Sequence, residues 1–67
     1  MAALKWTDTL EIAIQLSEAH PAQDPAQLRF TALMAMVQAL PEFDDAPERC
    51  GERILEAIQQ AWIDELE

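Results

Sequence analysis

Two pairs of prolines divide this sequence into three segments, and they limit its fold more than any other feature. Pro21 and Pro25 separate the first segment from the second, and Pro41 and Pro47 separate the second from the third. Because proline lacks an amide proton and ends helices, no helix is expected to run through either pair. No segment alternates between apolar and polar residues, so strands are not expected. We predict an all-α fold, a small orthogonal bundle of three helices with a helix-turn-helix-like arrangement as one version.

The chain of 67 residues is also short enough to limit its chemistry. A sequence of this length forms one domain, which we place over residues 1–67. It buries only about 60% of the surface that its unfolded form exposes. A deep catalytic cleft would remove core that so small a domain needs, so we do not expect an enzyme.

The first helix is predicted over residues 8–19. Asp8 and Glu11 have the spacing of a capping box, with Asp8 in the place of the usual serine or threonine. The apolar residues form a broad face that we expect to be buried: Leu10, Ile12, Ala13, Ile14 and Leu16. The opposite stripe is polar, and it is either an ordinary solvated face or a docking surface: Asp8, Glu11, Gln15 and Glu18.

The second helix follows a short turn that begins at Asp24-Pro25. Thr31 is expected to cap this helix. The absence of charge from Ala32 to Leu40 predicts that the helix is well buried.

The third helix is predicted to start between Asp45 and Glu52. Asp45 and Glu48 again have capping-box spacing, and a later start near Gly51 is the alternative. Its buried arc is predicted to contain Ile54, Leu55, Ile58, Ala61 and Trp62. We expect both tryptophans, Trp6 and Trp62, to anchor the core.

Thirteen acidic residues outnumber four basic ones, which gives a net charge of −9. Phosphate binding needs a basic surface, so this balance argues against nucleic acid as a partner and equally against an anionic membrane. Cations and basic protein surfaces are the partners that such a chain attracts. The sequence has neither an apolar run long enough to span a membrane nor the apolar core of a signal peptide. We therefore expect a cytoplasmic protein, and we expect it to be a monomer.

The single cysteine, Cys50, and the single histidine, His20, exclude a disulfide within the chain and a Cys/His metal set. We interpret Cys50 as a bystander thiol, although the adjacent Arg49 would lower its pKa. His20 is expected to interact with the last carbonyls of the first helix. Nothing in the sequence supplies a nucleophile together with its base.

The acidic residues are concentrated in the second part of the chain. Residues 1–41 hold four acids and two bases, whereas residues 42–67 hold nine acids and two bases. Asp44 and Asp45 lie near the start of the third helix, where the helix dipole stabilises anions, so they are either caps or ligands. Three acids within residues 64–67 lie at its C-terminal end, where the dipole disfavours each anion by roughly 0.3–1 kcal/mol. They form either a frayed, solvated end or a cluster for a cation or a basic partner.

Carboxylate oxygens are hard ligands that suit Mg²⁺, Ca²⁺, Mn²⁺ and, more weakly, Fe²⁺. The sequence has no EF-hand spacing, so any metal site is expected to be shallow, on the surface and weak. Glu48, Glu52 and Glu56 recur every four residues and form either a solvated face or part of a docking surface.

A series of short motifs runs in order through nearly the whole chain. The motifs are Leu4-Lys5-Trp6-Thr7-Asp8, Glu11-Ile12, Pro21, Asp24-Pro25, Arg29-Phe30-Thr31, Phe43-Asp44-Asp45, Pro47, Ile54-Leu55-Glu56-Ala57-Ile58, Trp62 and Asp64-Glu65. In its order and length this series resembles the IscX family, small acidic proteins of the bacterial ISC system for iron–sulfur cluster assembly. Residues 48–51 and the middle of the second helix depart from the family pattern, so Cys50 and His20 inherit no role from it.

The resemblance implies a compact helical fold of winged-helix or helix-turn-helix type that is used without DNA. It implies docking on a basic patch of the cysteine desulfurase IscS, modulation of sulfur transfer, and weak binding of ferrous iron without a tightly bound cofactor. The scaffold protein and the ferredoxin of the ISC system are further candidate partners. The alternatives are an iron donor for cluster assembly and a generic acidic interaction module.

The resemblance and the charge clusters together suggest which acids act. For ferrous iron we predict Asp8, Glu11, Asp44, Asp45, Asp64, Glu65 and Glu67. For the partner we predict Asp8, Glu11, Glu52, Glu56, Asp64, Glu65 and Glu67. The sequence leaves open whether the acids of the first helix lie beside those at the end of the third.

Overall fold

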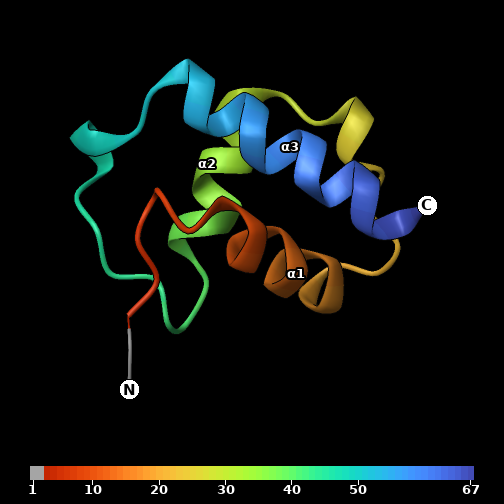
Figure 1. The fold of residues 1–67 in the computed structure, drawn as a ribbon, viewed down its shortest axis with the longest axis horizontal. Coiled ribbons are helices and arrows are strands. Elements are labelled where there is room, and N and C mark those ends of the chain that lie inside the picture. Colours follow the sequence, from red (N-terminus) through yellow and green to blue (C-terminus); the bar gives the residue numbers. More distant parts are fainter. Residues whose placement is uncertain (1–2) are drawn as a thin grey trace.

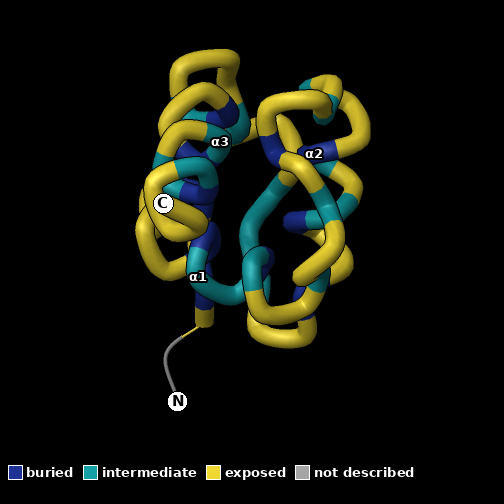
Figure 2. The backbone as a smooth tube through the Cα atoms, turned by 90° about the vertical axis from the view of Figure 1, so that its right-hand side faces the viewer, coloured by how far each residue is buried: buried dark blue, intermediate teal, exposed yellow. Residues whose placement is uncertain are grey.

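The computed structural model describes residues 3–67 of the chain. Three α-helices and two short 3₁₀-helices follow one another: α1 (Thr9–Ala19), η1 (Pro25–Gln27), α2 (Phe30–Gln38), η2 (Pro47–Arg49) and α3 (Glu52–Leu66). Helices α1 and α3 pack against each other, and α2 covers the other side of the core (Figures 1 and 2). Residues 3–67 contain no strand, so the predicted all-α bundle of three helices is confirmed.

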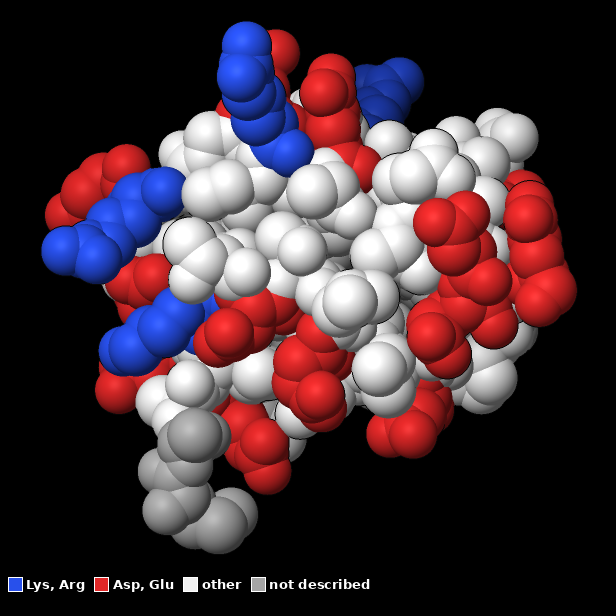
Figure 3. Space-filling view, viewed as in Figure 1, with Lys and Arg blue, Asp and Glu red and all other residues white. Residues whose placement is uncertain are grey.

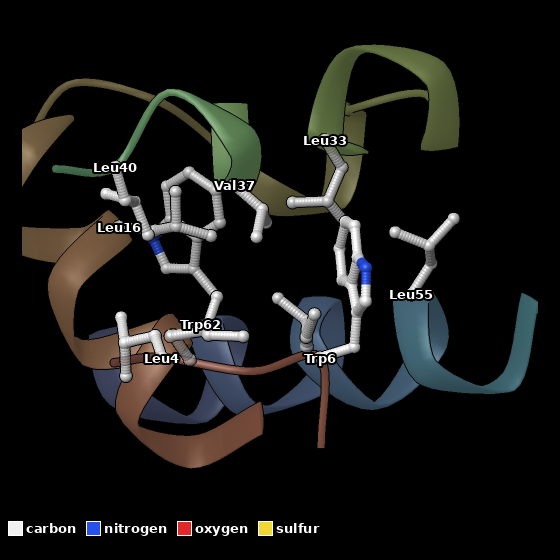
Figure 4. Close-up of a cluster of buried hydrophobic side chains, with 11 residues drawn as sticks. Leu4, Trp6, Leu16, Leu33, Val37, Leu40, Leu55 and Trp62 are labelled. Carbon is white, nitrogen blue, oxygen red and sulfur yellow. The ribbon is translucent and has the colours of Figure 1, made fainter. Parts of the chain in front are cut away.

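One hydrophobic core lies between the three helices and the N-terminal segment (Figure 4). Its buried members are Leu4, Trp6, Ile12, Ala13, Leu16, Leu33, Val37, Leu40, Leu55, Ile58 and Trp62. The two tryptophans are the largest fully buried side chains, which confirms their predicted role as anchors. Each helix therefore buries one face in a shared core, as short amphipathic helices must in order to be stable.

The N-terminal segment is fastened to the loop between α2 and η2 by an isolated parallel β-bridge between Leu4 and Phe43. The Leu4 N–H donates to the Glu42 carbonyl at 2.8 Å, and the Asp44 N–H donates to the Leu4 carbonyl at 2.9 Å. The Trp6 ring meets the Phe43 ring edge-on, with centroids 4.6 Å apart. We call these two segments, residues 4–8 and 42–46, the N-terminal junction.

The helix starts differ from the predicted caps. Asp8 lies at the cap position of α1, as predicted, but its carboxylate makes no cap hydrogen bond and instead accepts the Lys5 N–H at 3.0 Å. Helix α2 begins two residues early, with Arg29 rather than Thr31 at the cap position. Helix α3 begins at Glu52, the latest of the predicted starts, because Pro47–Arg49 form a separate 3₁₀ turn. The capping box predicted from Asp45 is therefore wrong.

The predicted apolar face of α1 is only partly buried. Ile12, Ala13 and Leu16 have no exposed surface, but Leu10 is 66% exposed. At about 100° per residue, Leu10 lies roughly 120° from Leu16 around the helix axis. The buried arc is thus narrower than the apolar stripe in the sequence, and the expected burial of Leu10 is wrong.

Helix α2 is less buried than its lack of charge predicts. Leu33 and Val37 are buried, whereas Ala32, Ala35 and Gln38 are exposed, because the helix covers the core with one face only. The turn predicted at Asp24-Pro25 is confirmed as η1, where the Asp24 carboxylate accepts the Ala26 N–H at 3.0 Å. Within residues 3–67, no helix has the length and apolar character needed to cross a membrane.

Candidate functional site

The charged side chains are unevenly distributed over the surface. Figure 3 shows the lysine and arginine side chains along the left and upper edges of the molecule. The right-hand side, where the C-terminus lies in Figure 1, carries acidic side chains and no basic one on the face shown. With a net charge of −9, this surface attracts cationic groups rather than anionic ones.

Asp45 is held by hydrogen bonds at the N-terminal junction. Its two carboxylate oxygens accept the Trp6 N–H at 3.1 Å and the Ala46 N–H at 2.8 Å. Its side chain is only 10% exposed, and the Arg49 guanidinium lies 3.9 Å away. The Trp6 N–H is the main reason why the pKa of Asp45 lies below its usual value, with further contributions from the Ala46 N–H, Arg49 and Lys5. Asp45 was predicted as an iron ligand, but both of its carboxylate oxygens already accept hydrogen bonds from backbone N–H groups.

Lys5 links the other acids of the same junction. Its N–H donates to the Asp8 carboxylate, and its ammonium donates to the backbone carbonyl of Asp44. The Asp44 carboxylate itself is exposed and accepts no hydrogen bond from residues 3–67. Adjacent acids in the sequence, Asp44 and Asp45, therefore have different roles in the structure.

The acids at the start of α1 face an acid that sequence reasoning did not select. Asp8, Glu11 and Glu42 line one shallow hollow beside Ala3 and Leu4. A second hollow contains Glu11, Glu18 and Glu42 above an apolar floor that includes Ile14 and Leu40. The Gln15 amide donates to Glu42 at 3.1 Å and fixes it toward α1. The stripe on α1 already contained Glu18, and Glu42 begins the acidic cluster Glu42-Phe43-Asp44-Asp45 in the sequence. Its position against α1 follows only from the packing of the chain.

The acids at the end of α3 are exposed, and we call Asp64, Glu65 and Glu67 the acidic end. Within the described chain, their only side-chain hydrogen bond runs from the Gln60 amide to Asp64, at 3.1 Å. The C-terminal end of α1 lies beside them, because the His20 ring is 6.5 Å from the Trp62 ring. Asp8 lies at the opposite end of α1, about 16 Å away at 1.5 Å per residue. The acids at the start of α1 and the acidic end are therefore two separate groups.

Glu52 and Glu56 lie on the first two turns of α3 and are exposed, as predicted. Arg53 lies between them in the sequence, so this part of the helix is less negative than the acidic end. Glu48 lies on η2 and does not continue the same helical face.

The predicted iron ligands do not gather at one place. Among residues 3–67, no group of three or more histidine, cysteine, aspartate and glutamate side chains is arranged to hold a metal ion. A fixed octahedral site for a hard cation needs several oxygen ligands that converge. The carboxylates of residues 3–67 therefore do not form a preassembled metal centre.

Cys50 and His20 have no catalytic arrangement. Burial raises the pKa of the Cys50 thiol, which overrides the lowering expected from Arg49. The thiol therefore stays protonated at neutral pH and is a poor nucleophile. The backbone N–H of His20 closes α1 by donating to the Leu16 carbonyl at 2.9 Å, while its ring lies near Trp62.

Known proteins match the chain over almost its whole length. The model of a protein family described as iron–sulphur cluster assembly matches residues 4–67. An uncharacterized protein of Pseudomonas aeruginosa is 59% identical over 63 residues, which are 94% of this chain and 96% of that protein. The family match covers both the N-terminal junction and the acidic end.

Proposed function

The chain belongs to the IscX family of iron–sulphur cluster assembly proteins, and on this premise we propose that it is an accessory protein that docks on the cysteine desulfurase IscS. In this proposal its acidic surface binds a basic patch of the enzyme and modulates sulfur transfer by occupying that patch. In this proposal the scaffold protein and the ferredoxin of the system bind the same basic patch of the enzyme, either in place of this chain or beside it.

The observation that carries the proposal is the set of acids that the fold leaves unused. The acidic end forms no ion pair within residues 3–67, and its carboxylates accept a single hydrogen bond there. The helix dipole makes anions unfavourable at this place, so folding alone gives no reason for three of them. A basic partner would supply the missing positive charge and would be attracted over long range.

The test is a binding titration against purified IscS at two ionic strengths. We expect the double variant Asp64→Asn/Glu65→Gln to bind about tenfold more weakly at low salt and to depend less on salt, because screened charge attraction is what it loses. The matched control is Asp44→Asn/Glu48→Gln, which makes the same change of charge elsewhere and is expected to bind like the wild type.

Two outcomes would contradict this proposal. Binding of the wild type that does not respond to salt would show that charge attraction is not the cause. An equal loss in the control pair would show that only net charge matters and that the acidic end has no special role.

We also propose that ferrous iron binds weakly, as cargo, through isolated carboxylates and water. The hollow that contains Asp8, Glu11 and Glu42 brings three carboxylates to one side of α1, yet they do not form a metal-holding group. An anaerobic titration with Fe²⁺ is expected to show weak association that Mn²⁺ and Mg²⁺ share. Tight, saturable and selective binding would contradict it.

A further inference from the structure

Leu10 is an apolar side chain that the fold leaves in water. Within the described chain, the large hydrophobic side chains that are exposed are Leu10, at 66%, and Leu66, at 53%. Leu10 lies on the first turns of α1 and lines a shallow depression with Thr7, Asp8, Thr9 and Glu11. The Leu10 side chain contributes almost nothing to the core. Packing of the core therefore does not explain why an apolar residue occupies this position.

Leu10 is not isolated, because Ile14 continues the apolar strip one turn later. The two side chains lie about 40° apart around the helix axis, and Ile14 is half-buried at the floor of the hollow beside Leu40. Glu11 and Glu18 lie about 20° apart and run along the edge of the strip. The outer face of α1 is therefore an apolar strip with carboxylates along one side.

We propose that this face is a docking surface on which Leu10 is the apolar anchor and the carboxylates are the rim. Its occupant is a basic protein surface that presents an apolar side chain or recess between its positive groups. Interfaces have this anatomy, because charge is depleted at their buried centre and kept at their wet border. This inference rests on the proposed function and identifies a second part of the contact with the desulfurase.

The charge of the chain decides between the possible occupants. A second copy would bring another −9 against the same acidic border, and an anionic membrane would be repelled in the same way. The apolar strip alone would accept any of these partners, but the carboxylates of Glu11, Glu18 and Glu42 favour a basic one.

The experiment measures the affinity of the full chain for IscS with Leu10→Ala and with the control Gln38→Ala, an exposed and uncharged position on α2, each at low and high salt. Alanine keeps the helix propensity of both sites. We expect Leu10→Ala to weaken binding about tenfold at low salt and equally at high salt, because salt does not screen an apolar contact. Glu11→Gln is expected to weaken binding mainly at low salt, and Gln38→Ala is expected to bind like the wild type.

The outcomes separate this inference from the function on which it rests. A wild type that does not bind IscS overturns the proposed function and this inference with it. A wild type that binds while Leu10→Ala binds equally well overturns the inference alone, as does an equal loss in Gln38→Ala. A wild type whose self-association disappears in Leu10→Ala, as measured by sedimentation, also overturns it, because the occupant is then a second copy.

Discussion

The N-terminal junction and the C-terminal half of α3 contain the same types of residue, but only at the junction does the buried tryptophan N–H find a hydrogen-bond partner within residues 3–67. Each contains a buried tryptophan and acidic residues. At the junction, the indole N–H of Trp6 donates to the Ala46 carbonyl at 2.8 Å, and Asp45 accepts two backbone N–H groups. In α3, the buried indole nitrogen of Trp62 has no partner among residues 3–67, and the acids beyond it face solvent.

This difference shows which polar groups stabilise the fold and which do not. A buried donor without a partner costs about 1–3 kcal/mol, and anions at a helix C-terminus are unfavourable as well. The junction has neither cost. Asp45 is therefore structural, whereas the acidic end is available for a partner.

The largest effect is expected from Trp6→Ala. Removing a fully buried aromatic ring costs about 3–5 kcal/mol, while a chain of this size has a stability of only roughly 3–10 kcal/mol. We expect the variant to be largely unfolded, as measured by circular dichroism and urea denaturation. A folded variant with a transition close to that of the wild type would show that the junction does not support the core.

Replacing each tryptophan by phenylalanine sharpens the comparison. Trp6→Phe leaves the Ala46 carbonyl without its donor, whereas Trp62→Phe removes a donor that had no acceptor. Both variants lose similar ring volume, so we expect Trp6→Phe to be less stable than Trp62→Phe by about 1 kcal/mol. Urea denaturation of the two variants side by side measures the difference, and the reverse order would contradict the distinction drawn here.

Asp45→Asn is expected to lower the urea midpoint at neutral pH, whereas Asp44→Asn is not. The two residues are neighbours, but only the Asp45 carboxylate accepts backbone N–H groups. The matched pair therefore separates a loss of charge, which both share, from a loss of hydrogen bonds.

The pH dependence of this difference follows from the lowered pKa of Asp45. Its usual value is 3.8, and its value in the folded chain is lower, so the ionised carboxylate stabilises the fold at neutral pH. This contribution is present above 3.8 and is lost as the pH falls through the lower, folded value. The gap between the wild type and Asp45→Asn should thus close on acidification, and a gap that widens would be inconsistent with it.

The smallest effect on stability is expected at the acidic end. Glu65→Gln removes an exposed anion near a helix C-terminus, so the free energy of unfolding should change by less than about 0.5 kcal/mol, with a slight gain. Thermal denaturation at low salt is the suitable measurement. A clear loss of stability would mean that the Glu65 carboxylate stabilises the folded chain, as the Asp45 carboxylate does.

Local patterns in the sequence were enough to predict the three helices. The proline pairs separate them, and the apolar periodicity of α3 placed Leu55, Ile58 and Trp62 in the core, where the structure has them. The ordered motifs were enough for the family, whose model matches residues 4–67. These features depend on composition and on residues that are near in sequence, so no tertiary contact is needed to recognise them.

Tertiary structure alone decided which acids have hydrogen-bond partners within the chain and that Leu10 is exposed. Trp6 and Asp45 are 39 residues apart in sequence, and Glu42 reaches Gln15 across 27 residues. No local spacing encodes such contacts, because they form only when the helices pack. The same holds for Leu10, since the arc of α1 that is buried depends on where α3 lies and not on the apolar pattern of α1 itself.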